Sequence, residues 1–232
     1  MPELMLIPGL NNTGDVFAGV VQALPVGVTA HCPSCPPLER VEAIADALLE
    51  TAPERFFLAG FSFGGYVALA MLARVPQRVA GIALICSDSG ADTPAQRERR
   101  RAARQRAADG EYEAMIEAQA GNAFHPASLA RPDLLAARRR MVSDYGAERF
   151  IAHTEAVMQR PDRTGLLDGL RPTLFVAASD DAVFPPAGVQ ARAAAVPGAQ
   201  YVCLPDAGHL LPMEQPRALA DVLAAWVSAR RG

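Results

Sequence analysis

The sequence predicts an α/β protein in which a mostly parallel sheet of about six strands is flanked by helices, with one helical insertion. Two observations lead to this fold class. Six short, continuously apolar runs are each bounded by glycine, proline or polar residues, as expected for strands buried on both faces. Segments with helical periodicity separate most of these runs, and parallel neighbouring strands need such crossovers.

Strands and helices are predicted to alternate along most of the chain. The six strand-like runs are 4–7, 28–32, 56–59, 81–86, 173–178 and 200–205. The helical segments are 38–52, 64–74, 188–196 and 217–230. In open sheets of this kind, ligands bind beyond the carboxyl ends of the strands, so we expect a site at that edge.

The alternation stops between residues 93 and 167, where helical signals follow one another. Thr93, Pro94 and Gln96 form the pattern of a capping box that starts a helix. The arginine-rich run 97–106 is interpreted as a solvated helical face, with contact to an anionic substrate as the less favoured alternative. A helix with one apolar face is then indicated by the spacing of Phe150, Ile151, Thr154, Val157 and Met158.

We therefore divide the chain into a core, residues 1–93 and 167–232, and a helical insertion, residues 94–166. An insertion beyond the carboxyl ends of the strands would form a cap, or lid, over the ligand crevice. The alternative is that the insertion packs against an edge of the sheet.

The composition favours a globular protein that acts on a small molecule. Half of the 232 residues are hydrophobic, and the formal net charge of -3 gives no reason to expect nucleic acid or a membrane surface as a partner. All 22 basic residues are arginine, which excludes lysine chemistry such as Schiff bases and P-loop binding. No signal peptide or membrane span is recognisable, so we predict a cytoplasmic protein, either a monomer or a homodimer.

The four cysteines do not predict a disulfide framework. Cys32 and Cys35 form a C-x-x-C pair, which is found in redox sites and in halves of zinc sites. Cys86 and Cys203 lie in strand-like runs and have no paired spacing that would complete a zinc site. We therefore interpret the pair as two incidental thiols in a proline-rich loop, and we predict no metal.

Ser62 is the candidate nucleophile. It is the serine of a G-x-S-x-G pattern that lies between a predicted strand and a predicted helix, the context of a nucleophile elbow. Gly60 and Gly64 are needed there because side chains in so sharp a turn would collide with the neighbouring strand and helix, and Gly65 allows a further close approach. The turn would expose the hydroxyl at a helix N-terminus, which favours developing negative charge.

A serine nucleophile needs a base, and the base needs an acid that orients it. His209 is the candidate base because it follows the last predicted strand, in a loop that can carry its ring over the sheet. The other three histidines are less suitable. His31 lies in a predicted strand, whereas His125 and His153 lie in the insertion, where a surface or packing role is expected.

The candidate acid is one of two adjacent aspartates, Asp180 and Asp181, that follow the predicted strand 173–178. Only one of them can face the histidine, because neighbouring side chains in an extended segment diverge. Asp88, which follows another strand, is the less favoured substitute.

These motifs resemble the α/β-hydrolase superfamily, and in particular its capped members. The resemblance extends over nearly the whole chain, through "PGL", "GFSFGG", "DTPAQ", "ASDDAVFP" and "GHLLPMEQP". The order Ser, Asp, His is also that of the family. The family pattern G-x-x-D-x-x-x-P falls on Ala178, Asp181 and Pro185, which selects Asp181 over Asp180. A second pattern, G-H-x-x-x-x-E-x-P, includes Glu214.

The resemblance implies a Ser-His-Asp triad of Ser62, His209 and Asp181. It also implies an oxyanion hole formed by the backbone N–H groups of Leu10 and Phe63. The expected reaction is hydrolysis of a small to medium carboxylic ester, lactone or thioester through an acyl-enzyme, without a cofactor.

Two further points concern the binding pocket. Many relatives carry His-Gly after the first central strand, where this chain has Pro8 and Gly9. Because the oxyanion donors are backbone groups, this departure need not abolish the hole. The candidate substrate contacts are Asn11, Phe124, Tyr145 and Phe150.

Three alternative functions fit the same sequence. Hydrolysis of a carbon–carbon bond and acyl transfer use the same triad. A catalytically silent ligand-binding protein of the same fold is the non-enzymatic alternative. Function has to be argued from the site, because one fold supports many activities.

Overall fold

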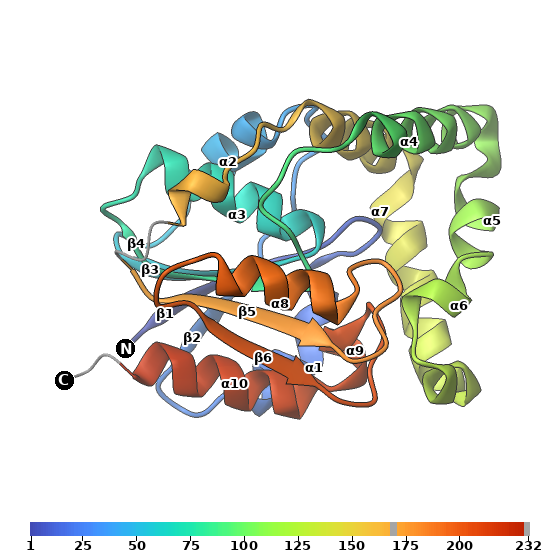
Figure 1. Cartoon of the computed structure of the whole chain (residues 1–232). Helices are drawn as coiled ribbons and strands as arrows, with labels where there is room; N and C mark the ends of the chain where they lie inside the picture. Colours follow the sequence, from blue (N-terminus) through green and yellow to red (C-terminus); the bar gives the residue numbers. More distant parts are fainter. Residues whose placement is uncertain (168–170, 230–232) are drawn as a thin grey trace.

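The computed structural model describes residues 1–167 and 171–229 (Figure 1). Arg230, the predicted end of the last helix, lies outside the described residues, as do the core residues 168–170. Within the described ranges, six strands form one all-parallel sheet in the order β2-β1-β3-β4-β5-β6. The strands are β1 (Glu3–Ile7), β2 (Thr29–His31), β3 (Phe56–Phe61), β4 (Val79–Ile85), β5 (Thr173–Ala178) and β6 (Gln200–Leu204).

Helices cover both faces of the sheet, as Figure 1 shows. One face is covered by α2 (Val41–Leu49), α3 (Phe63–Arg74) and α8 (Pro186–Ala194). The other is covered by α1 (Ala18–Ala23) and α10 (Pro216–Ser228), while the short α9 (Leu211–Glu214) precedes α10. The prediction of an α/β fold with a parallel sheet of about six strands is therefore correct.

The apolar runs form central strands because both of their faces are buried. Along β1, Leu4 and Leu6 belong to the hydrophobic cluster on the α1 and α10 side, whereas Met5 and Ile7 belong to the cluster on the α2 and α3 side. A strand places successive side chains on opposite faces, so a strand in the middle of a covered sheet needs apolar residues at every position.

The edge strands and the helix ends differ from the prediction. β6 is an edge strand, and most of its residues are exposed or half-buried, so it is not covered on both faces as expected. α2 begins three residues later than predicted because Arg40 is extended, and Leu38 lies in a turn after the prolines of this loop. Both departures depend on neighbours in space or on loop conformation.

The described part of the segment between β4 and β5 is helical and contains no strand. Its α-helices are α4 (Pro94–Arg106), α5 (Tyr112–Glu117), α6 (Ala120–Ala123) and α7 (Pro132–Gln159). Thr93 and Gln96 make both hydrogen bonds of the predicted capping box at the start of α4. Figure 1 shows α5, α6 and α7 beyond the carboxyl ends of the strands.

None of the helices in the described ranges combines the length and the apolar character that crossing a lipid bilayer requires.

Candidate active site

Ser62 lies in the sharp turn between β3 and α3. Its φ of 51° is in the left-handed region, which is unusual for a residue other than glycine. The turn is held by backbone bonds on both sides: the Ser62 N–H donates to the carbonyl of Ile85 at 2.9 Å, and the Gly65 N–H donates to the carbonyl of Ser62 at 2.9 Å. The hydroxyl of Ser87 also donates to the Ser62 carbonyl, at 2.7 Å.

The glycines of the G-x-S-x-G pattern allow the strand and the helix to approach each other. A Cβ atom on Gly60 would lie 2.4 Å from the carbonyl oxygen of Gly64. A Cβ atom on Gly64 would lie 2.1 Å from the carbonyl oxygen of Ile7, and one on Gly65 would lie 2.2 Å from Oγ of Ser87. Side chains at these positions would therefore collide with the neighbouring strand and helix, as expected from the sequence.

We expect Gly64→Ala to destabilise the protein by about 3 kcal/mol or more, because its new methyl group would meet backbone atoms of β1 that cannot rotate away. The measurement is urea-induced unfolding followed by circular dichroism. Gly188→Ala in α8 is the matched control, since no atom lies within 4 Å of its added Cβ, and it should leave stability unchanged or slightly raised. Equal stability of the two variants would contradict this account of the turn.

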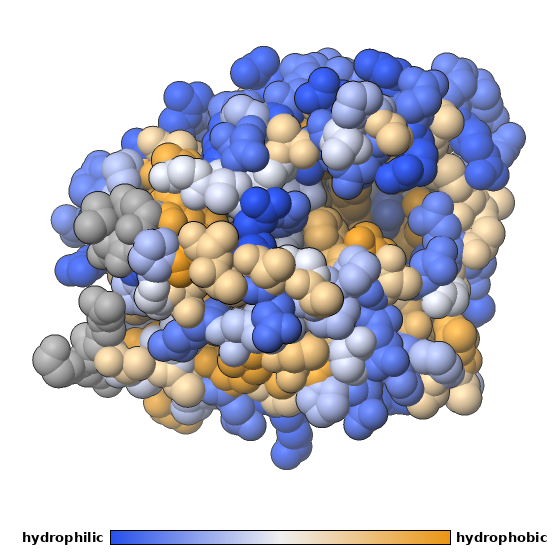
Figure 2. All heavy atoms as spheres, viewed as in Figure 1, coloured by the Kyte–Doolittle hydropathy of each residue, from blue (hydrophilic) through white to orange (hydrophobic). Residues whose placement is uncertain are grey.

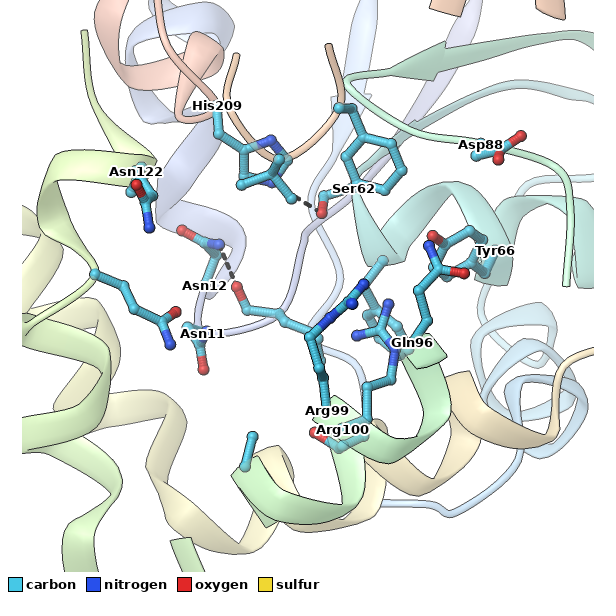
Figure 3. A pocket seen from close by; sticks show the side chains of 18 of the residues that line it. Asn11, Asn12, Ser62, Tyr66, Asp88, Gln96, Arg99, Arg100, Asn122 and His209 are labelled. Carbon is cyan, nitrogen blue, oxygen red and sulfur yellow. Dashed lines mark hydrogen bonds between the residues drawn. The ribbon is translucent and has the colours of Figure 1, made fainter. Parts of the chain in front are cut away.

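Ser62, His209 and Asp181 form one hydrogen-bonded series. The His209 Nε2 and Ser62 Oγ atoms are 3.0 Å apart, and the His209 Nδ1 and Asp181 Oδ2 atoms are 2.9 Å apart. Figure 3 shows His209 beside Ser62 with this bond marked. With Nδ1–H donating to the carboxylate, Nε2 is left to accept the proton of the serine hydroxyl.

Asp181 is buried and held on both oxygens. Its Oδ1 accepts the backbone N–H groups of Val183 and Phe184, each at 2.8 Å, while Oδ2 faces His209. Burial by itself raises the pKa of this carboxyl group. The hydrogen bond and charge of His209 and the two backbone donors outweigh burial, so the Asp181 pKa lies below its usual value and the group is ionised.

A buried glutamate holds the loop that carries His209. Glu214 accepts the Gly208 N–H at 2.9 Å and the His125 N–H at 2.8 Å. The Leu210 N–H donates to the carbonyl of Ala123 at 2.9 Å. The histidine loop is thus tied to the helical segment at α6. The sequence pattern included Glu214 but gave no reason for its presence.

The alternative acids and bases lie elsewhere. Asp180 is exposed, accepts the hydroxyl of Ser179, and lies 3.8 Å from His125. Asp88 pairs with Arg192, with 2.8 Å between the carboxylate and Nε. His31 bonds Glu3 at 2.6 Å in the edge strand β2. None of these residues is bonded to Ser62 or His209.

The two candidate oxyanion donors, the backbone N–H groups of Leu10 and Phe63, belong to segments that line the cavity together with Ser62. Phe63 is the first residue of α3, so its N–H has no acceptor within the helix. Leu10 follows β1, and both residues line the same cavity as Ser62. The next residue, Asn11, has a φ of 61°, and its side-chain oxygen accepts the hydroxyl of Tyr112 at 3.2 Å. A tyrosine of the helical segment therefore braces this loop.

A buried histidine braces the other side of the turn. The His153 ring stacks on Phe63, with ring centroids 4.8 Å apart. Its Nδ1 bonds the Tyr145 hydroxyl at 2.6 Å and its Nε2 bonds the Pro36 carbonyl at 2.7 Å. Burial lowers the His153 pKa to about 4, so the ring is neutral near pH 7. The predicted packing role of His153 agrees with this position.

The triad opens into a cavity of about 620 Å³ between the sheet and the helical segment. In Figure 2 the surface is hollowed to the right of centre, beside α4. Asn11 and Phe150, two of the predicted substrate contacts, line this cavity, and so does Asn12. The apolar part of the lining consists mainly of Leu10, Phe63, Ile116, Ala123, Phe150, Val183, Phe184 and Leu210.

The other two predicted substrate contacts do not line the cavity. Phe124 is 2% exposed and belongs to the hydrophobic core below the sheet. Tyr145 is 5% exposed and packs between α5 and α7, where its hydroxyl bonds His153. Large aromatic residues stabilise a core as well as a pocket, and sequence position alone does not separate these roles.

Five of the described arginines line the cavity, and none of them is among the substrate contacts predicted from the sequence. Arg99, Arg100, Arg138, Arg160 and Arg192 all line it. The first two belong to the run 97–106 that we interpreted as a solvated face. Because α4 turns one side of this run toward the cavity, Arg99 and Arg100 line the cavity, whereas their immediate neighbours along the helix do not.

One cluster of the described residues has the donor types of a metal site: Cys86, Asp181 and His209, with donor atoms within 4.8 Å of one another. Burial raises the pKa of the Cys86 thiol well above its usual value, and Asp181 adds to this effect. A protonated thiol is a poor metal ligand, and the other two residues already bond each other.

The C-x-x-C pair is also unsuited to thiolate chemistry. Cys32 and Cys35 are free thiols. Burial raises the pKa of Cys32 to about 11 and that of Cys35 to about 12. Both groups therefore remain protonated near pH 7.

Comparison with known proteins gives consistent matches over the whole chain. A family model described as "Alpha/beta hydrolase family" matches residues 4–222. The pimeloyl-[acyl-carrier protein] methyl ester esterase of Stenotrophomonas maltophilia (strain K279a) is 30% identical, with 98% of this chain and 93% of that protein covered.

Solved structures agree with these matches. A thermophilic esterase from Thermogutta terrifontis, determined with malate bound, has a TM-score of 0.91 and 26% identity, with 99% of this chain and 90% of that chain covered. The enol-lactonase from Burkholderia xenovorans LB400 has the same fold, with a TM-score of 0.83 and 23% identity over 98% of this chain and 91% of its own. The predictions of an α/β-hydrolase fold and of a hydrolase are confirmed by these matches, and the chain belongs to the alpha/beta hydrolase family.

Proposed function

We infer that the protein is a serine hydrolase that cleaves small to medium carboxylic esters, lactones or thioesters through an acyl-enzyme. The observation that carries this proposal is the hydrogen-bonded series from Ser62 through His209 to the ionised Asp181, in which Ser62 and His209 line the cavity. The relatives named above as esterases support the same reaction class.

In the proposed mechanism, the Ser62 hydroxyl attacks the substrate carbonyl while His209 Nε2 takes its proton. The imidazolium then protonates the leaving alcohol or thiol. Asp181 keeps the proton of His209 on Nδ1 and stabilises the imidazolium. Water, deprotonated by the same histidine, hydrolyses the acyl-enzyme and regenerates Ser62.

The tetrahedral oxyanion is proposed to accept the N–H groups of Leu10 and Phe63. In comparable sites one such donor contributes roughly 3 kcal/mol to transition-state stabilisation. The Tyr112 bond to Asn11 and the stacking of His153 on Phe63 support this assignment, because they fix the two segments that carry the donors. The segment 94–166 is proposed to act as the cap of this site, since its residues supply much of the cavity wall.

The test is labelling with a fluorophosphonate, which reacts with serines that are already activated and needs no knowledge of the substrate. We expect a single adduct on Ser62, found by mass spectrometry of the modified peptide, and complete loss of labelling in Ser62→Ala. Ser87→Ala is the matched control. Ser87 lies beside the same turn, but its hydroxyl donates to the Ser62 carbonyl, so this variant should still acquire the adduct on Ser62. A folded protein that acquires no adduct would contradict the proposal and favour a silent ligand-binding protein.

A further inference from the structure

We propose that the cavity selects esters that carry an anionic group away from the scissile bond, and that Arg99 binds that group. This inference rests on the proposed hydrolase function and adds a substrate class to it. It follows from the distribution of charge on the cavity wall opposite His209. Figure 3 shows Arg99 and Arg100 on α4, across the cavity from His209.

Most of the arginines on this wall already have partners. Asp92 is buried and forms ion pairs with two guanidinium groups, that of Arg100 at 2.7 Å and that of Arg160 at 2.8 Å. Arg160 also lies over the Tyr66 ring, 3.8 Å from its centroid, and donates to the Gly90 carbonyl. These contacts fix Arg100 and Arg160 as part of the wall.

Two further arginines of the lining also have carboxylate partners, although Glu117 is shared between Arg138 and Arg139. Arg192 pairs with Asp88 at 2.8 Å. Arg138 pairs with Glu117 at 3.3 Å and donates to the Ile116 carbonyl. These two residues are therefore held by the protein itself.

Arg99 is different. Among the residues that the structure describes, no carboxylate lies within 4.0 Å of its guanidinium group. The next arginine along α4, Arg101, is exposed and pairs with Glu98 at 3.1 Å. Among the described arginines of the cavity lining, Arg99 is thus the one whose guanidinium N–H groups remain available to bind a ligand.

The local charge balance leads to the same conclusion. The part of the wall formed by α4 and its neighbours contains four guanidinium groups, and three carboxylates face them. The arginines are Arg99, Arg100, Arg160 and Arg192, and the acids are Asp88, Asp92 and Asp162. One positive charge remains, and a planar guanidinium binds a carboxylate or phosphate through two parallel N–H donors.

The position of this charge indicates which kind of substrate benefits. Ser62 and His209 lie at one side of the cavity and Arg99 at the other. The anion must therefore be on a part of the ester remote from the reacting carbonyl, in either the acyl or the alcohol portion. Because Arg99 is exposed, the interaction is screened by salt and its contribution is moderate.

Paired substrates test the inference. For the acyl portion, the mono-4-nitrophenyl ester of adipic acid is compared with the neutral 4-nitrophenyl hexanoate, which has the same chain length. For the alcohol portion, the butyrate ester of 4-hydroxybenzoate is compared with that of methyl 4-hydroxybenzoate. Arg99→Gln should lower kcat/KM for the anionic member of at least one pair about tenfold, chiefly through KM, because the variant loses the charge that binds the anion; tenfold corresponds to about 1.4 kcal/mol.

The controls separate charge recognition from a structural defect. Arg99→Gln should leave the neutral esters unaffected, and Arg99→Lys should recover part of the preference for the anion. Arg101→Gln, on the same helix but outside the cavity lining, should leave every ratio unchanged. The preference of the wild type should also fall as ionic strength rises.

Two results would overturn the inference: equal losses for the charged and neutral esters in Arg99→Gln, or no loss for either. If no ester is turned over and the fluorophosphonate does not label Ser62, the proposed function itself is wrong. Calorimetric binding of adipate then still decides the question, because Arg99→Gln should weaken it about tenfold and Arg101→Gln should not. Equal adipate binding by all three proteins would reject the anion site.

Discussion

Replacing His209 with alanine should lower kcat by about a million-fold, because triad members act as a unit and the loss of one removes most of their joint effect. The His209 ring contacts both Ser62 Oγ and Asp181 Oδ2. Among the residues that the structure describes, no other base is bonded to the serine hydroxyl. The measurement is hydrolysis of a 4-nitrophenyl ester over a range of substrate concentrations.

His31→Ala is the matched control for this variant. His31 is also bonded to a carboxylate, that of Glu3, but it lies on the edge strand β2 and outside the cavity lining. Its kcat should equal that of the wild type. Circular dichroism should show that the His209 variant remains folded. If folded His209→Ala retained near wild-type turnover, Ser62 would need another base and the triad would have to be abandoned.

Replacing Asp181 with asparagine should lower kcat about ten-thousand-fold, as expected when an amide replaces the carboxylate that sets the histidine tautomer. The amide can present its NH₂ group to Nδ1, and the imidazole would then keep its proton on Nε2, where it cannot accept the proton of Ser62. The pKa of Asp181 lies below its usual value, so the wild-type carboxylate stays ionised throughout the neutral range.

Asp180→Asn provides a neighbouring control with the same chemical change. Asp180 is exposed and is bonded to Ser179 rather than to His209, so its variant should keep nearly full activity. The comparison of kcat for the two variants decides which aspartate is the acid. A larger loss for Asp180→Asn would reverse the assignment that rests on the G-x-x-D-x-x-x-P pattern.

Much of the core could be predicted because its sequence patterns are local. The run 173–178 forms β5 with the predicted bounds, and Thr93 with Gln96 makes the predicted capping box. The predicted ends of strands and starts of helices agree less closely with the structure. The extended conformation of Arg40 delays α2, and β6 is half exposed because the sheet ends there.

Two of the four predicted substrate contacts do not line the cavity. Asn11 and Phe150 line the cavity, but Phe124 and Tyr145 are buried in hydrophobic clusters. Which aromatic side chain faces a cavity depends on how α5 to α7 pack, and α7 is kinked at Gly146, where φ is 77°. Such packing is a property of several distant segments together.

The sequence by itself determined the fold class and the residue types at the elbow, because alternation, glycine spacing and motif order are properties of short segments. It could name Ser62, His209 and Asp181 as candidates, but only the tertiary structure places their reactive atoms 3.0 Å and 2.9 Å apart. The tertiary structure alone also distinguishes Arg99 from Arg101. Both belong to one arginine-rich run, and their roles differ because charge pairing and exposure to the cavity depend on contacts between segments that are far apart in the chain.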